Sequence, residues 1–367
     1  MQILFDHQKF TDQNYGGITR YFANLALNLY NFKEDIKIIA PIHSNEYLLD
    51  LPDNIVVGRY SNFPPKRLNK IFFTANTYFS QYLERKYNPD IIHETYYSDS
   101  KILKSQCSRV LTVYDMIHER FSSSFPSFDN TATLKKKAIS RADHIIAISE
   151  NTKKDLIEMY NIDEKKITAI HLSWSETITT NNIKNNKPII DRPYILYVGS
   201  REGYKNFNLL VKSLSLSQKL KKSINLISFG GPSFSNEELK IFKDLSFSNN
   251  QIIHMRGDDK LLSNLYQNAT AFIFPSLYEG FGIPPLEAMA NKCPVISSNT
   301  SSMPEVIGDA AEYFNPNSIE NLIYAIEKVV FSDIRKKELT QLGLDRIKRF
   351  SWEKCSNQTL SIYKTLL

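Results

Sequence analysis

Two glutamates surround a loop of glycine, phenylalanine and paired proline in the stretch YEGFGIPPLEAMANKCPVISSN, residues 278–299. Proline suits the start of a helix, where its missing N–H would have no partner, so Pro284-Pro285 predicts a helix from about Pro285 to Asn291. Glu287 then lies in the first turn, where exposed N–H groups and the helix dipole favour a phosphate. The stretch therefore predicts a ligand-binding helix start; the alternative is that both glutamates only complement the dipole.

On both sides of this stretch, short apolar runs alternate with segments of helical period. Such alternation is typical of a parallel sheet covered on both faces by helices, so the predicted class is α/β. In the first half the predicted strands are Gln2–Phe5, Ile36–Ala40, Ile55–Val57, Ile91–His93, Val110–Val113, His144–Ile148 and Ile167–Ile170, with helices that include Gly17–Leu29 and Asn151–Tyr160.

A polar, asparagine-rich segment, Glu176–Pro193, interrupts the pattern and predicts a linker. A second series follows, with strands at Tyr194–Val198, Ile224–Phe229, Ile252–Met255, Ala271–Phe274 and Pro294–Ile296, and helices near Phe207–Ser215, Lys260–Gln267, Pro285–Asn291 and Ile319–Val330. Each half begins with a strand, a glycine-containing turn and a helix. We therefore expect two doubly wound sheets whose strand carboxyl ends meet at a common cleft.

The composition favours a globular protein of two domains. The chain has 367 residues, of which 42% are hydrophobic, and its longest apolar runs fall far short of a membrane span. The three scattered cysteines and the absence of a leader-like start favour a reducing cytoplasm. A net charge of +6 is mild for a nucleic-acid binder and compatible with anionic ligands or lipid headgroups.

Two cations lie in the turn that follows the first strand of the second half, YILYVGSREGYKN. Arg201 and Lys205 would repel each other unless solvent or an anion separates them, and a guanidinium fork matches phosphate. A diphosphate is the natural ligand of such a turn. The alternative is an ordinary solvated basic turn.

The first half offers weaker signals after its strands. Gly16-Gly17 precedes a helix and could bring backbone N–H groups to a phosphate or sugar, although a glycine pair is often only a turn. Asp115 and His118 follow the strand that ends in LTV and are candidates for acceptor or sugar contacts. The alternative for His118 is a structural cap or a surface residue.

Several motifs of other enzyme classes are missing from the sequence. There is no D-x-D triplet, no Cys/His pair at zinc spacing, no G-x-x-x-x-G-K-[ST] and no G-x-S-x-G. Metal-dependent, P-loop and α/β-hydrolase interpretations therefore lose their main sequence support.

Taken together in this order, the motifs resemble the retaining nucleotide-sugar glycosyltransferases of family four. The most specific match is Glu279 to Glu287, which looks like the family's Glu-seven-Glu motif; YVGSREGYKN, ISFGGPS, DAAEYFNP and FSWEKCSNQTLSIYKTL are also similar. The resemblance covers nearly the whole chain and is strongest over residues 194–316. It implies the GT-B fold of two facing Rossmann-like domains.

The resemblance also implies domain boundaries and individual roles. The first domain would span residues 1–175 and take back a C-terminal helix over 352–367, with a linker over 176–192 and a second domain over 193–351. Glu287 would accept hydrogen bonds from the nucleotide ribose and Glu279 would hold the donor sugar. The other implied contacts are the backbone of Phe281, Gly282 and Ile283 at the sugar, the N–H near Leu286, the cations Arg201 and Lys205 at the diphosphate, and the Gly16-Gly17 loop.

One position departs from the family pattern. Many members have histidine directly after the strand ending in LTV, where it contacts the donor sugar, whereas this chain has Tyr114. His118 lies four residues later, so its equivalence to that histidine is open.

The family implies transfer with retention of anomeric configuration, without a protein nucleophile or a metal. For the donor, a mannose-like or deoxy sugar on GDP is the first guess and UDP sugars are the second. The Lys- and Asn-rich composition suits a low-GC bacterial genome, which makes O-antigen or capsule assembly on a lipid-linked acceptor at the inner membrane face plausible. The rival interpretations are a sugar-nucleotide epimerase or hydrolase of the same shape and a non-catalytic binding module.

The segment PPKRLNKIFFTANTYFSQYLERKY, residues 64–87, predicts an amphipathic helix. Its apolar side would carry Leu68, Ile71, Phe72, Ala75, Tyr78, Phe79 and Tyr82, with Lys66, Arg67 and Lys70 near its start. Such a helix could dock on anionic lipid. The alternative is a helix that packs this side on the core.

Overall fold

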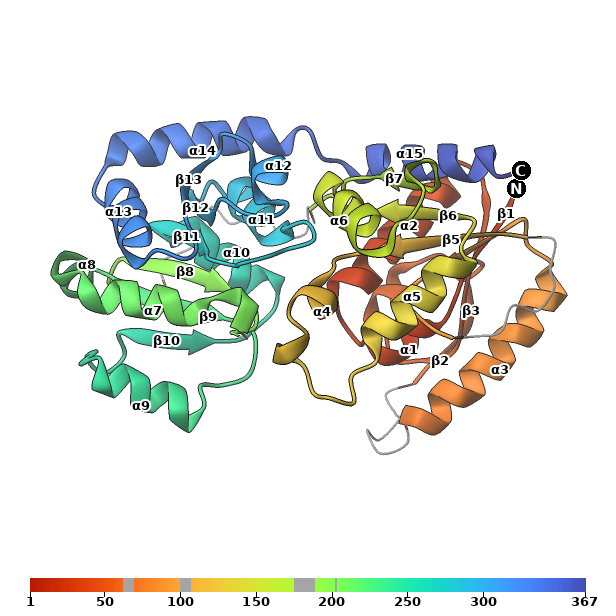
Figure 1. The fold of residues 1–367 in the computed structure, drawn as a ribbon, viewed down its shortest axis with the longest axis horizontal. Helices are drawn as coiled ribbons and strands as arrows, with labels where there is room; N and C mark the ends of the chain where they lie inside the picture. The colour runs from red at the N-terminus through yellow and green to blue at the C-terminus, as the bar shows by residue number, and fades with distance from the viewer. Residues whose placement is uncertain (62–68, 100–106, 175–188, 202) are drawn as a thin grey trace. The chain divides into compact units, whose positions relative to one another are not determined.

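The computed structural model describes residues 1–61, 69–99, 107–174, 189–201 and 203–367. The chain divides into two compact units, one formed by Met1–Leu172 with Ser351–Leu367 and the other by Ser173–Phe350. Each unit is an α/β domain built on a parallel sheet (Figure 1). The α/β class predicted from the sequence is therefore confirmed. Most of the expected linker, residues 175–188, lies outside the described residues.

The first unit contains, within the described residues, a seven-stranded sheet in the order β3-β2-β1-β4-β5-β6-β7. Its strands are β1 (Gln2–Phe5), β2 (Asp35–His43), β3 (Val56–Tyr60), β4 (Ile91–Glu94), β5 (Ser108–Val113), β6 (His144–Ala147) and β7 (Ile167–Ala169). Its α-helices are α1 (Gln8–Asp12), α2 (Gly17–Asn31), α3 (Asn69–Tyr87), α4 (Ile117–Arg120), α5 (Thr131–Arg141), α6 (Glu150–Tyr160) and α15 (Trp352–Thr365). The reversal of strand order between β1 and β4 is that of a doubly wound fold.

The second unit contains a six-stranded parallel sheet in the order β10-β9-β8-β11-β12-β13, again within the described residues. Its strands are β8 (Tyr194–Val198), β9 (Asn225–Phe229), β10 (Ile252–Met255), β11 (Ala271–Phe274), β12 (Val295–Ser298) and β13 (Ala311–Phe314). Its α-helices are α7 (Phe207–Leu216), α8 (Gln218–Ser223), α9 (Asn236–Asp244), α10 (Asp259–Asn268), α11 (Ile283–Ala290), α12 (Met303–Ile307), α13 (Ile319–Val330) and α14 (Asp333–Ile347). The predicted strands of both halves are present. The sequence prediction missed the edge strand β13, which has only four residues and includes a glutamate.

The last helix, α15, belongs to the first unit and packs on α2. A hydrogen bond of 2.5 Å joins the Tyr363 hydroxyl to Nδ1 of His93 on β4, and both side chains are fully buried. The Ser108 hydroxyl donates to the Leu366 carbonyl at 3.0 Å. These contacts fix the C-terminal helix against the first sheet, although Tyr363 and His93 are 270 residues apart in sequence.

Helix α3 packs on the first sheet with the side that carries Asn76, Ser80, Leu83 and Tyr87. Asn76 and Ser80 are buried, and the Asn76 amide donates to the Ile42 carbonyl at 2.7 Å and to the Thr11 hydroxyl at 2.9 Å. The apolar side points outward instead, since Ile71, Tyr78, Phe79 and Tyr82 are 60–71% exposed. The alternative of a core-packing apolar side is therefore wrong for these residues. Leu68, Lys66 and Arg67 lie outside the described residues, as does the side chain of Lys70.

Candidate active site

Helix α11 begins at Ile283, two residues earlier than the sequence predicts. Gly282 caps it with φ +103°, a left-handed conformation that favours glycine. Glu287 is then the fifth residue of the helix rather than part of its first turn, which corrects the sequence prediction. The N–H of Leu286, the fourth helical residue, is positioned to donate the first intrahelical hydrogen bond to the carbonyl of the cap residue Gly282. Pro284 and Pro285 have no N–H. The N–H groups that precede the first intrahelical bond at this helix start are therefore those of Gly282 and Ile283.

Glu279 is held from several directions in the loop before α11. Its Oε1 lies 2.7 Å from Nζ of Lys205 and accepts a 2.6 Å hydrogen bond from the Ser276 hydroxyl. Its backbone N–H donates to the Ser301 hydroxyl at 2.9 Å, while the Ser302 hydroxyl donates to its carbonyl at 2.9 Å. The residue is only 8% exposed. The carboxylate therefore has a fixed position before any ligand binds.

Glu287 lies on α11 and is also buried. Its neighbour Tyr266 on α10 is fully buried, and the tyrosine hydroxyl donates to the Pro284 carbonyl at 3.3 Å. Burial raises the pKa of Tyr266 well above its usual value, and the charge and hydrogen bonding of the Glu287 carboxylate raise it further. Tyr266 therefore stays protonated and orients the start of α11 together with Glu287.

Arg201 follows β8 and has its guanidinium fork occupied. Nε and Nη2 donate to the two carboxylate oxygens of Glu238 on α9 at 2.6 and 3.2 Å. Nη2 also donates to the carbonyls of Pro232 and Ser233 at 2.8 and 3.3 Å. Nε and Nη2 of the fork are therefore already held by a carboxylate and two carbonyls, and the diphosphate role of Arg201 stays a prediction.

The repulsion expected between the two cations of the turn is resolved by two glutamates. Glu238 neutralises Arg201, and Glu279 neutralises Lys205. The turn is therefore not an ordinary solvated basic turn, since the side chains of Arg201 and Lys205 are only 5% and 20% exposed. Sequence reasoning missed Glu238, although the capping box that it forms with Ser235 at the start of α9 has a readable S-x-x-E pattern.

The remaining candidates lie in the first unit, whereas Glu279 lies in the second. Gly16 caps α2, and its carbonyl accepts from the Arg20 N–H at 3.0 Å, while Gly17 begins the helix with open space where a Cβ would be. The Asp115 carboxylate accepts a 3.0 Å hydrogen bond from the N–H of Ile117, the first residue of α4. Asp115 therefore orients the turn that leads into α4.

His118 and Tyr114 also have well-defined surroundings. The His118 ring stacks on Phe125 with centroids 4.2 Å apart, and its Nε2 lies 3.9 Å from Asp129. Tyr114 is buried, and its hydroxyl donates to the Thr95 carbonyl at 2.9 Å. The tyrosine hydroxyl is therefore already used in a hydrogen bond inside the fold.

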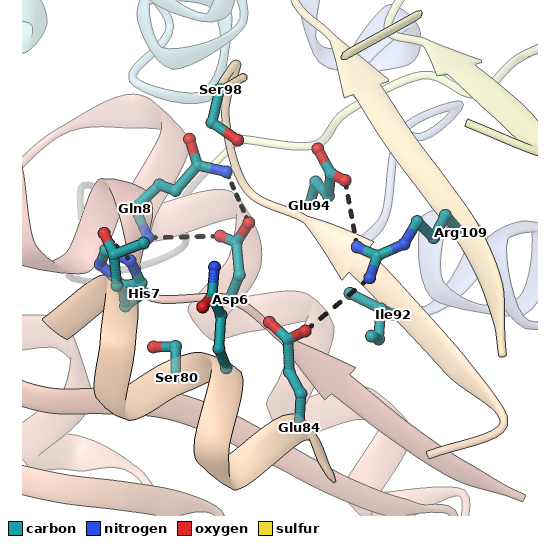
Figure 2. A pocket seen from close by; sticks show the side chains of 11 residues that line it. Asp6, His7, Gln8, Ser80, Glu84, Ile92, Glu94, Ser98 and Arg109 are labelled. Atoms are coloured by element: carbon teal, nitrogen blue, oxygen red, sulfur yellow. Dashed lines mark hydrogen bonds and ion pairs between the residues drawn. The ribbon is translucent and has the colours of Figure 1, made fainter. Parts of the chain in front are cut away.

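A polar pocket lies under α3 in the same unit (Figure 2). Asp6, Glu84 and Glu94 line it with Arg109, whose guanidinium lies 3.3 Å from Glu94 and 3.8 Å from Glu84. Arg141 also pairs with Glu94. Burial raises the pKa of Glu84 to about 7, although Arg109 opposes the shift. Burial likewise raises the pKa of Asp6 and of Glu94.

Two further searches cover the described part of the chain. No group of three or more His, Cys, Asp or Glu side chains there is placed to hold a metal ion. None of the described helices combines the length and hydropathy that crossing a bilayer requires.

Two Rossmann-like domains, a basic turn after β8 and a Glu-seven-Glu loop define a glycosyltransferase of the GT-B class. Family profiles agree over most of the chain: Glycosyl transferases group 1 matches residues 178–343, and Glycosyltransferase Family 4 matches residues 15–172. The chain belongs to the family-four glycosyltransferases. The resemblance found in the sequence is therefore confirmed.

Among curated proteins, the chain is 27% identical over 282 residues to O-antigen chain mannosyltransferase B of Escherichia coli, covering 74% of each protein. It is 29% identical to the O-antigen chain mannosyltransferase RfbU of Salmonella typhimurium, over 60% of this chain and 61% of that protein. The serotype-specific mannosyltransferase WbdA of Escherichia coli is 28% identical over 66% of this chain, but the match spans only 31% of WbdA.

Solved structures share the fold at lower identity. WaaG, a glycosyltransferase involved in lipopolysaccharide biosynthesis, superposes with a TM-score of 0.72 at 16% identity, covering 98% of this chain and 99% of WaaG. HepE of Anabaena, in complex with UDP and glucose, gives a TM-score of 0.74 at 15% identity over the full length of both chains. These similarities establish the GT-B fold.

Proposed function

We propose that this enzyme transfers a sugar from a nucleotide-sugar donor to a lipid-linked saccharide during assembly of an O-antigen or a related bacterial polysaccharide. The fixed pair of Lys205 and Glu279 beside the start of α11 carries the proposal, because it places a cation and a sugar-binding carboxylate together. The names of the O-antigen mannosyltransferases above support mannose as the transferred sugar. GDP as its carrier remains the first guess from the sequence, with UDP second.

Each group of the site has a task in this reaction. The bond between the sugar C1 and the diphosphate oxygen breaks, and an acceptor hydroxyl forms a new bond to C1 on the same face and gives its proton to the leaving phosphate. Lys205 and Arg201 stabilise the negative charge that grows on the diphosphate, so no metal is needed. In this proposal Glu279 positions the sugar and Glu287 the ribose, and the N–H groups of Gly282 and Ile283 at the start of α11 bind the donor.

The Gly16-Gly17 loop, Asp115 and His118 belong to the acceptor-side domain in this proposal. A saccharide acceptor presents hydroxyls, and carboxylate and imidazole groups recognise hydroxyls by hydrogen bonds. Gly17 has room for close approach of a ligand to the backbone. Asp115 can bind an acceptor hydroxyl while it also accepts the Ile117 N–H, since a carboxylate accepts several hydrogen bonds.

A test of the function incubates purified protein with GDP-mannose, UDP-glucose and other nucleotide sugars, with and without a lipid-linked saccharide extract. We expect one donor to be consumed only with acceptor, and NMR of the product to show the donor's anomeric configuration. Release of free nucleotide and sugar without acceptor would indicate an epimerase or hydrolase. Binding without turnover would indicate a non-catalytic module.

The proposal includes peripheral contact with an anionic membrane through α3. The outward side chains Ile71, Phe73, Tyr78, Phe79 and Tyr82 form an aromatic face that is 38–71% exposed. Arg85 and Lys86 are exposed at the end of the same helix, and the sequence adds Lys66, Arg67 and Lys70 at its start. Aromatic side chains between basic ends suit the interface of an anionic bilayer, which is where a lipid-linked acceptor is presented.

A further inference from the structure

Several contacts hold the Arg201 guanidinium near the carboxyl end of β8. Its fork meets both oxygens of Glu238, and its Nη2 reaches two backbone carbonyls. The guanidinium carbon also lies 4.7 Å from the ring centroid of Phe234 and 5.8 Å from that of Phe207. Three kinds of contact therefore fix one orientation of this cation.

One nitrogen of the guanidinium takes no part in these hydrogen bonds. Nη1 is buried and has no hydrogen-bond partner in the part of the chain that the structure describes. It lies beside Gly231, where a Cβ would stand 3.5 Å from Nη1 and 3.2 Å from the Gly199 carbonyl oxygen. Gly231 has φ +65°, so this close approach of the turns after β8 and β9 depends on glycine.

A buried charged donor without a partner needs an explanation. Here it lies at the carboxyl edge of a parallel sheet, which is where open α/β sheets bind their ligands. An anionic oxygen that enters between the two glycine turns would give Nη1 the partner that the protein does not provide.

We propose that Glu238 is a positioning residue of the donor site, and that it holds the Arg201 guanidinium so that Nη1 remains for a phosphate oxygen of the nucleoside diphosphate. This inference rests on the proposed function, which it deepens by one residue. Glu238 reaches the diphosphate only through Arg201, and it lies 37 residues away in sequence on α9.

The geometry favours a positioning role over one in which Glu238 competes with the phosphate for Arg201. A competing carboxylate would have to release the arginine, and release would also break the bonds to Pro232 and Ser233. Partial burial acts to raise the pKa of Glu238, but hydrogen bonds from Arg201 and Ser235 outweigh it, so the pKa is lowered. The carboxylate therefore stays charged at neutral pH and keeps its hold.

The test measures binding of GDP, UDP, ADP and dTDP, and of the matching nucleosides, by titration calorimetry. We expect Glu238→Ala to weaken binding of the preferred diphosphate at least tenfold and to leave nucleoside binding unchanged. Glu238→Gln keeps a side chain suited to the capping box, so it should weaken diphosphate binding less than Glu238→Ala does. Glu237→Gln changes the exposed neighbouring glutamate in the same turn and should bind like the wild type.

A double-mutant cycle separates positioning from a general structural role. If Glu238 acts through Arg201, the double variant Arg201→Ala with Glu238→Ala will bind the diphosphate no more weakly than Arg201→Ala alone. Unchanged or tighter diphosphate binding by Glu238→Ala would overturn the inference. An equal loss of affinity for the diphosphate and for the nucleoside would overturn it too.

The binding assay is independent of sugar transfer. A wild-type protein that binds a nucleoside diphosphate but transfers no sugar would contradict the proposed function and still support the role of Glu238 if the variants behave as expected. A wild-type protein that binds none of the four diphosphates would overturn both.

Discussion

Nζ of Lys205 lies 2.7 Å from Oε1 of Glu279, and this ion pair joins the basic turn after β8 to the loop before α11. The two residues are 74 positions apart in sequence. The same carboxylate oxygen accepts the Ser276 hydroxyl, so the cation is placed before a donor arrives. Preorganisation of this kind avoids reorganising the site during the reaction.

Replacing Lys205 or Arg201 with alanine should reduce turnover far more than it affects folding. Loss of one preorganised partner of a growing charge typically costs about 2.7–4 kcal/mol, or roughly 10²–10³ in rate. Steady-state kinetics at saturating donor measure the effect, and circular dichroism checks the fold. Lys212→Ala removes an exposed cation from α7 and serves as the control. Near-normal rates in both site variants would refute the assignment of the diphosphate site.

Glu287→Ala should mainly weaken donor binding. In the proposed site its ribose hydrogen bonds exist before and during transfer, so their loss raises KM more than it lowers kcat. Hydrogen bonds to a charged group contribute about 1.5–3 kcal/mol, which corresponds to a rise in KM of roughly 10- to 100-fold. Glu320→Ala, at an exposed position on α13, is the control. A fall in kcat with unchanged KM would contradict the ribose role.

The aromatic face of α3 should be needed for binding to anionic vesicles. Serine at Tyr78, Phe79 and Tyr82 removes three side chains that are 60–71% exposed, so folding should change little. Burial of each aromatic side chain in lipid stabilises by about 1.5–3 kcal/mol when complete, so the triple variant should bind at least tenfold more weakly. Co-sedimentation with anionic and neutral liposomes measures this.

Two further variants sharpen the vesicle experiment. Phe128→Ser removes an aromatic side chain that is 86% exposed elsewhere in the first unit, and it should not affect binding. Glutamine at Lys66, Arg67 and Lys70 should weaken binding to anionic vesicles only. If the serine triple variant co-sediments like the wild type, α3 is not the membrane contact.

Tyr363→Phe should destabilise the first unit by about 1–3 kcal/mol, because it leaves the buried His93 nitrogen without its partner. Urea unfolding followed by circular dichroism measures the free energy of unfolding. Tyr324→Phe removes the hydroxyl of a tyrosine that is 67% exposed and should change nothing. Equal stability of the two variants would mean that the hydrogen bond does not hold α15 in place.

Glu84→Gln should stabilise the protein increasingly as pH rises. Burial raises the folded-state pKa of Glu84 from 4.5 to about 7. The folded chain therefore binds the proton more tightly, and the stability this group contributes below pH 4.5 is lost as pH rises toward 7. Glu84→Gln has no charge to lose or gain here, so its free energy of unfolding relative to the wild type should rise by about 1–3 kcal/mol between pH 4.5 and 8.

Urea unfolding across this pH range provides the measurement. Glu158→Gln replaces an exposed glutamate on α6 and should follow the wild type at every pH. A constant difference between Glu84→Gln and the wild type would show that Glu84 does not titrate in this window.

The sequence by itself determined the α/β class, the positions of the predicted strands, and the family. These properties depend on residues close together in the chain, such as apolar runs of four to six residues and the Glu279–Glu287 motif. It also identified Arg201 and Lys205 as charges that need partners. Local periodicity and spacing are sufficient for such features because each is decided within one or two elements.

Other features of the site were decided only by tertiary structure. Which carboxylate neutralises Arg201 depends on how β8 and α9 pack, and nothing local links Arg201 to Glu238. Helical periodicity showed that α3 has an apolar side, but not that the side with Asn76 would bond to β2 and α1. The orientation of α3 on the first sheet is decided by the sum of many contacts between distant segments, because each contact contributes little free energy alone.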